Sequence, residues 1–99
     1  MLSFLNSPGD ILVDVARRAR ALRLQANLTQ EGLALRAGMS AASLKRFERT
    51  GLIAFDALVR IAFALNAEKE FAALFPPVAF KSIEDGLRKE KARKRGVLK

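Results

Sequence analysis

The fold of this 99-residue chain is decided by one stretch, Leu28-Thr-Gln-Glu-Gly-Leu-Ala-Leu-Arg-Ala-Gly-Met-Ser-Ala-Ala-Ser-Leu-Lys-Arg-Phe-Glu-Arg-Thr-Gly51. Thr29 and Ser40 are each placed to cap a helix, because a hydroxyl oxygen there can accept a bond from an unpaired amide of the first turn. Gly38 supplies a flexible turn between the two helices, and Thr50-Gly51 ends the second. The stretch therefore predicts short helices over Thr29 to Ala37 and Ser40 to Arg49, joined by a tight turn, which is the arrangement of a helix-turn-helix.

The second of these helices has one apolar and one cationic side. Leu44 and Phe47 recur at a three-residue spacing and are expected in the core, together with Leu33 from the helix before. Lys45, Arg46 and Arg49 are cationic. A basic helix face is most often only solvated, but after a tight turn it is also what a helix needs to enter the major groove of DNA.

The flanking sequence predicts three more helices. Asp10 is a candidate cap for a first helix, whose buried face would carry Leu12, Val15, Ala19 and Leu22 and whose end is expected at Asn27, a residue type that tolerates positive φ. Beyond Gly51, a fourth helix is indicated by apolar residues at i, i+3, i+4 and i+7 and is expected to end at Asn66; its buried positions are Leu58, Ile61, Ala62 and Leu65. A short fifth helix, Glu68 to Phe75, stops at Pro76-Pro77, since proline disfavours helical geometry in the residue before it.

Composition supports an all-α fold. Ala (17) and Leu (15) outnumber Val, Ile and Thr together (11), so helix propensity dominates. We expect a five-helix DNA-binding domain over residues 10–77, an N-terminal arm over residues 1–9 and a basic tail over residues 78–99. Within the tail, Ser82 to Asp85 has the spacing of a capping box, and Lys89 to Lys99 is expected to be disordered.

Charge and missing residue types narrow the function. The net charge of +8 indicates a polyanionic partner. Residues 81–99 contain eight basic and three acidic side chains and so account for most of this excess. The chain has no Cys and no His, which removes thiol nucleophiles, the usual general base and the commonest zinc ligands. We therefore expect no catalytic residue, metal or cofactor. The start of the chain does not resemble a signal peptide and no apolar run reaches the length of a membrane span, so a cytoplasmic location is expected.

The chain resembles the XRE or lambda-repressor-like helix-turn-helix family over about residues 12–75. The resemblance is carried by Leu28 to Gly51, by Arg23 before it and by Leu58 to Asn66 after it. A closer similarity, to HipB-like antitoxins that accompany HipA-type kinase toxins, is carried by the string Leu44 to Gly51, by Leu74-Phe-Pro-Pro77 and by the basic tail. The resemblance implies an ion pair between Arg23 and Glu48. The positions that it assigns to base edges of DNA are Ala41, Ala42, Lys45 and Arg46, and those that it assigns to phosphates are Thr29, Gln30, Arg49 and Thr50.

These observations favour a sequence-specific DNA-binding repressor, and within that class an autoregulating antitoxin. The protein is expected to be a homodimer on a near-palindromic operator in double-stranded DNA, with an interface at Phe71, Leu74 and Phe75 joined by the apolar start Met1 to Leu5. The alternative is a protein-interaction module that inhibits a HipA-like kinase toxin or acts as a phage adaptor, with DNA binding secondary. An RNA-binding protein lacks support because Tyr and Trp are absent and most Phe are expected to be buried. An enzyme is the least supported class, since the acidic residues are scattered and no nucleophile or phosphate-binding motif is present.

Overall fold

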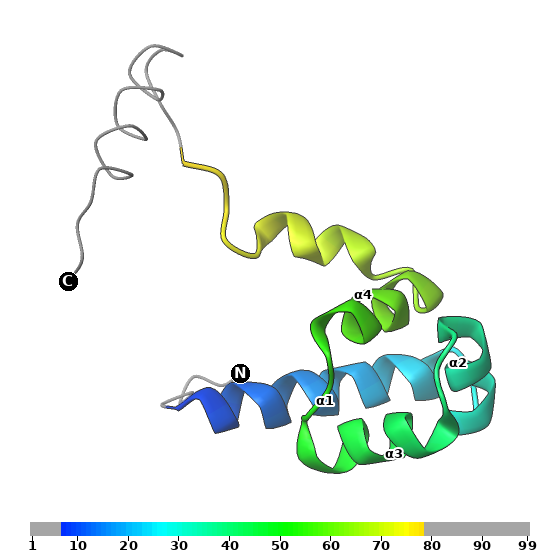
Figure 1. The fold of residues 1–99 in the computed structure, drawn as a ribbon. Coiled ribbons are helices and arrows are strands. Elements are labelled where there is room, and N and C mark those ends of the chain that lie inside the picture. Colours follow the sequence, from blue (N-terminus) through cyan, green and yellow to red (C-terminus); the bar gives the residue numbers. More distant parts are fainter. Residues whose placement is uncertain (1–6, 79–99) are drawn as a thin grey trace.

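The computed structural model describes residues 7–78, and this part of the chain is all helical (Figure 1). It contains four α-helices and one 3-10 helix: α1 Pro8–Gln25, α2 Gln30–Ala37, α3 Ala41–Thr50, α4 Phe55–Ala64 and η1 Glu68–Ala73. The expected all-α, helix-turn-helix fold is confirmed. The apolar start Met1 to Leu5, the capping-box spacing at Ser82 and the basic cluster Lys89 to Lys99 lie outside the described residues.

One small core joins α1 to α4. In this core α3 packs against both α1 and α2, α2 packs against α4, and η1 contacts only α4 closely. The largest fully buried side chains are Phe47, Leu33, Leu44 and Ile61. The core positions expected in the second and third helices are therefore confirmed. Burial of Leu44 and Phe47 holds α3 by its apolar side, so its opposite side faces outward.

Three helix ends share one local arrangement. A residue with positive φ follows each of these helices within two positions of its end: Asn27 at 60°, Gly38 at 67° and Asn66 at 57°. The amide of the residue after it reaches back to the helix, from Leu28 to Arg23 O, from Met39 to Ala34 O and from Ala67 to Ala62 O. This is the Schellman pattern, which gives partners to carbonyl groups of the last turn. The expected roles of Asn27, Gly38 and Asn66 in ending helices are confirmed.

Helix starts follow the side-chain caps. Thr29 Oγ1 accepts a bond from Gly32 N at 2.9 Å, and Ser40 Oγ accepts one from Ser43 N at 3.1 Å, as expected. The expectation that Asp10 caps α1 is wrong. Ser7 caps it instead, accepting from Asp10 N, and the helix begins at Pro8, whose fixed φ and missing N–H suit the first helical position.

The buried face of α1 is displaced from the expected one. Val15 and Ala19 pack against the core, but Leu12 and Leu22 are each 40% exposed, and the fully buried residues of this helix are Ala16 and Arg23. The buried positions Ala16 and Arg23 are each one residue on from Val15 and Leu22 of the predicted face.

The fifth helix also differs from the prediction. It is a 3-10 helix that ends at Ala73, two residues before Phe75, and none of its residues is fully buried. The preceding helix matches its predicted face, because Ile61 and Ala62 are buried and Leu58 and Leu65 pack against the core. The chain thus leaves the core after α4, and η1 is held by few contacts.

Candidate nucleic-acid interface

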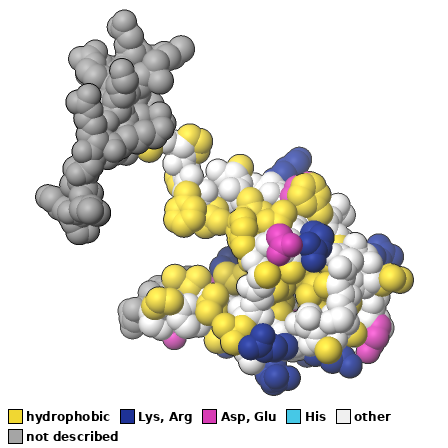
Figure 2. Space-filling model, viewed as in Figure 1, with side chains coloured by type: hydrophobic (Ala, Val, Ile, Leu, Met, Phe, Trp, Pro, Cys, Tyr) yellow, Lys and Arg dark blue, Asp and Glu magenta, His cyan; other side chains and the backbone are white. Residues whose placement is uncertain are grey.

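The outward side of α3 is cationic. Leu44 and Phe47 are buried, whereas Lys45, Arg46 and Arg49 are exposed. Lys and Arg side chains gather at the lower edge of the molecule, over α3 (Figure 2). Hydrophobic side chains instead cover α4 and η1 in the same view. The two kinds of surface are therefore separated, with the positive one on the helix that follows the tight turn.

A buried ion pair fixes α3 in place. Arg23 on α1 donates from Nε to Glu48 Oε2 at 2.7 Å and from Nη2 to Glu48 Oε1 at 3.1 Å. The two side chains are only 7% and 5% exposed. A third nitrogen, Nη1, donates to the carbonyl oxygen of Leu28 at 2.8 Å, in the loop before α2. The expected ion pair between Arg23 and Glu48 is confirmed. It is bidentate, so it fixes the relative orientation of the two side chains as well as their distance.

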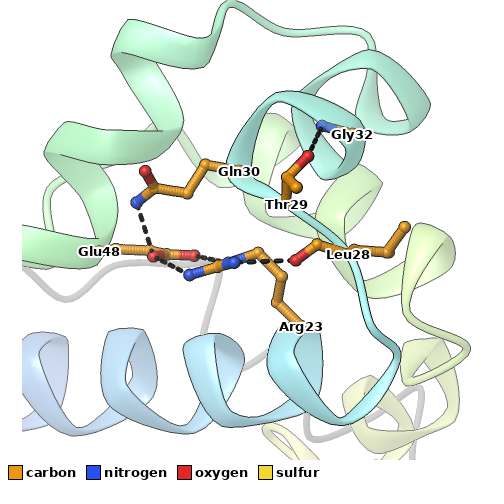
Figure 3. Close-up of polar contacts among 6 residues, drawn as sticks. All are labelled: Arg23, Leu28, Thr29, Gln30, Gly32 and Glu48. Carbon is orange, nitrogen blue, oxygen red and sulfur yellow. Dashed lines mark hydrogen bonds and ion pairs between the residues drawn. The ribbon is translucent and has the colours of Figure 1, made fainter.

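Gln30 connects α2 to the same junction. Its amide nitrogen donates to Glu48 Oε1 at 2.9 Å, so Glu48 accepts bonds from both α1 and α2 (Figure 3). Thr29 lies beside it and caps α2 through Gly32. Because Glu48 is on α3, this set of contacts ties the start of α2 and the end of α1 to one residue of the exposed helix. The orientation of α3 is consequently set by polar contacts as well as by its core side chains.

Two of the four expected phosphate positions keep donors available. The amide nitrogen of Gln30 carries two N–H groups, and Glu48 uses one of them. Thr29 accepts from Gly32, which leaves its own hydroxyl proton free to be donated. Both residues are at the start of α2, so a phosphate there would also meet the positive end of the helix dipole.

The other two expected phosphate positions differ from each other. The side chain of Arg49 is exposed and makes no hydrogen bond or ion pair within residues 7–78. Thr50 uses its hydroxyl inside the fold, donating to Arg46 O at 2.7 Å and accepting from Leu52 N at 3.1 Å. Its proton is therefore engaged in closing the end of α3, and Arg49 is the stronger candidate for a phosphate contact.

The residues expected to contact bases differ in exposure and in their partners. The side chain of Arg46 is exposed and has no hydrogen bond or ion pair in the described part of the chain. Lys45 lies 3.4 Å, Nζ to Oε2, from Glu31 on α2, and its side chain is 50% exposed. Ala42 is exposed, whereas Ala41 is half-buried against the core. Arg46 is thus the side chain most available to an incoming ligand.

Sequence reasoning missed three features of the surface. Glu31 was not expected beside Lys45, because their contact crosses from α2 to α3. Arg60 donates to Ala37 O at 2.8 Å and so gives a partner to the last carbonyl of α2. The expectation that most Phe are buried is wrong for the described ones, of which only Phe47 is buried; Phe55, Phe63 and Phe75 are 62%, 61% and 89% exposed. The i, i+4, i+8 spacing of Phe55, Val59 and Phe63 was the available signal of a second apolar side on α4.

Comparison with known proteins agrees with this geometry. The family model described as a helix-turn-helix domain matches residues 14–74, and the chain therefore belongs to the helix-turn-helix domain family. The match runs from within α1 to just beyond η1 and includes the turn at Gly38 and the whole of α3. No curated protein and no solved structure gives a match. Membership of this family supports a role as a DNA-binding regulator, and helix-turn-helix domains are typically non-enzymatic. None of the helices in residues 7–78 is long and apolar enough to cross a membrane.

Proposed function

We propose that this protein is a sequence-specific transcriptional repressor that inserts α3 into the major groove of double-stranded DNA. The observation that carries the proposal is the free, exposed Arg46 on a helix whose orientation is fixed by the Arg23, Glu48 and Gln30 contacts. A guanidinium group can donate two parallel bonds to guanine O6 and N7, which makes Arg the commonest base reader in the major groove. Lys45 is proposed as the second base reader, and Ala42 and Ala41 as methyl contacts.

Phosphate contacts are proposed for Thr29, Gln30, Arg49 and Thr50, with Arg49 as the main cationic contributor. These groups flank the base-reading face, so they would set the register of α3 without reading sequence. Thr50 would have to release its bond to Arg46 O before it could donate to a phosphate.

The Arg46→Ala variant is expected to lose discrimination between DNA sequences. Its affinity for the cognate site should fall by about 1 to 3 kcal/mol, since one bidentate base contact is lost, while its affinity for random DNA should change little. Lys45→Ala should behave similarly. Fluorescence anisotropy with labelled cognate and random duplexes at fixed salt measures both affinities.

Arg49→Ala is the matched control, because it removes the same charge from the same helix. This variant should weaken binding to both duplexes alike and reduce the slope of log affinity against log salt by about 0.9, the value for one phosphate contact. Wild-type discrimination by Arg46→Ala would contradict base reading by α3.

We further propose that the protein acts as a homodimer on a near-palindromic operator. The proposed interface comprises Phe71, Leu74 and Phe75, of which Leu74 is 48% and Phe75 89% exposed. Phe71 is half-buried because its ring packs edge to face on Phe55, at 5.9 Å between centroids. Exposed apolar side chains grouped in this way are typical of an interaction surface. Twofold symmetry would then place two α3 helices about 34 Å apart, one turn of B-DNA.

Phe75→Asp should produce a monomer, since its exposed ring contributes little to the fold but would be buried between two copies. Leu35→Asp is the control, because Leu35 is 82% exposed on α2 and lies outside the proposed interface. Sedimentation at micromolar concentration measures the association state. The wild-type chain sedimenting as a monomer, both free and on DNA, would refute the dimer.

An autoregulating antitoxin is the subtype of repressor that we propose. The second candidate is a protein-interaction module that inhibits a HipA-like kinase or serves as a phage adaptor, and the exposed Phe55 and Phe63 on α4 favour a protein partner. Co-expression with an adjacent kinase gene, where one is present, distinguishes them. Loss of co-purification in Phe63→Asp with unchanged DNA binding would support the protein partner, and failure of the wild-type pair to co-purify would exclude it.

A further inference from the structure

The ion pair between Glu31 and Lys45 lies on the side of the molecule proposed to meet DNA. It joins the first turn of α2 to the exposed side of α3, with 3.4 Å between Glu31 Oε2 and Lys45 Nζ. The side chains are 67% and 50% exposed. An exposed pair of this kind adds little to folding stability, so its main effect is expected on what binds there.

Glu31 remains ionised at neutral pH. Its pKa lies below the ordinary value, first because its own backbone N–H donates to the carboxylate and next because Lys45 contributes a hydrogen bond and a positive charge. A polyanion approaching α3 would therefore meet a fixed negative charge beside Lys45. That charge opposes phosphate oxygens and competes with them for the ammonium group.

A lysine ammonium has three N–H donors, so Lys45 can keep its bond to Glu31 while it donates to a base edge. A contact with the DNA backbone would require the flexible side chain to leave the carboxylate. Base contact by Lys45 therefore keeps the ion pair, whereas phosphate contact breaks it. This difference favours DNA that offers a matching base over DNA that offers only phosphates.

We propose that Glu31 is a specificity-determining residue, which positions Lys45 for base contact and penalises its binding to phosphate. The proposal rests on the proposed DNA-binding function and assigns Glu31 a positioning role within it. On DNA without a matching base, Lys45 stays with Glu31 and the carboxylate repels nearby phosphates. On the cognate site, Lys45 donates to guanine with the ion pair intact.

Glu31→Gln should raise affinity for a random-sequence 30-bp duplex about fivefold, the effect of one removed charge at close range in water. The slope of log affinity against log salt should steepen by about 0.9, because Lys45 becomes free to contact a phosphate. Affinity for the best site selected from a random DNA pool by the wild-type protein should change less than about twofold, since weaker repulsion is offset by poorer placement of Lys45. Discrimination should therefore fall.

Glu70→Gln is the matched control, because it makes the same charge change at an exposed position of η1, away from α3 (Figure 1). This variant should leave both affinities at wild-type values. The Lys45→Met background provides the second control, in which Glu31→Gln should no longer alter discrimination. Equal gains on both duplexes, or an undiminished effect of Glu31→Gln without Lys45, would overturn the proposal.

The wild-type measurements separate this inference from the proposed function. Failure of the wild-type chain to bind either duplex would refute DNA binding itself. Normal wild-type discrimination, retained in Glu31→Gln, would refute only the role of Glu31. Far-UV circular dichroism checks that each variant keeps the helical fold.

Discussion

Glu48→Ala should destabilise the protein by about 3 to 5 kcal/mol, the usual consequence of removing one partner from a buried ion pair. Arg23 would keep its bond to Leu28 O but would lose both bonds to the carboxylate, with its side chain only 7% exposed. Gln30 would lose its acceptor as well. Urea unfolding followed by circular dichroism suits this chain, which has no Trp or Tyr for fluorescence.

The double variant Arg23→Met with Glu48→Leu is the control for this prediction. It replaces both charges by apolar groups, so no buried charge is left unpaired, and such replacements are often neutral or stabilising. We expect the double variant to be more stable than Glu48→Ala. A smaller loss in the single variant than in the double would show that the buried pair is not what holds α1 and α3 together.

Gly51→Ala should cost about 2 to 5 kcal/mol of unfolding free energy, for two reasons that add. Gly51 ends α3 with φ at 83°, a conformation that costs an L-residue about 1 to 2 kcal/mol. A Cβ atom there would also lie 2.7 Å from the carbonyl carbon and oxygen of Leu12, which are backbone atoms and cannot rotate aside. Forcing α1 and α3 apart adds about 1 to 3 kcal/mol, as in other overpacked cores.

Gly38→Ala separates these two contributions. Gly38 also has positive φ, at 67°, but the nearest atom to an added Cβ is Arg60 Nε at 3.9 Å, an ordinary contact. This variant should therefore lose only about 1 to 2 kcal/mol. Equal losses in the two variants would show that the close approach of Leu12 to Gly51 has no energetic consequence.

The helix ends were predictable because they depend on chemistry within a few residues. Thr29 and Ser40 cap amides three positions ahead, and Asn27 and Gly38 adopt a conformation that their residue types tolerate. The cationic side of α3 was predictable for a similar reason, since the spacing of Leu44 and Phe47 determines which side is buried.

Most contacts between separate helices could not be predicted from the sequence. Periodicity selects apolar residues and does not indicate a buried arginine, and Leu12 and Leu22 were wrongly placed in the buried face of α1, where Ala16 and Arg23 are the buried residues. The contacts of Glu31 with Lys45 and of Arg60 with Ala37 O depend on distances through space between helices. The Arg23 to Glu48 pair was predicted only because a family resemblance supplied the pairing.

Selection of bound duplexes from a random DNA pool, followed by sequencing, tests the central claim most directly. The account predicts enrichment of one motif, an inverted repeat whose half-sites are centred about 10 bp apart, because two copies of α3 would read one face of the duplex. Each half-site should contain guanine at the position that Arg46 reads, and Arg46→Ala should relax the preference at that position. Recovery of unenriched sequences by the wild-type protein would contradict sequence-specific DNA recognition by this fold.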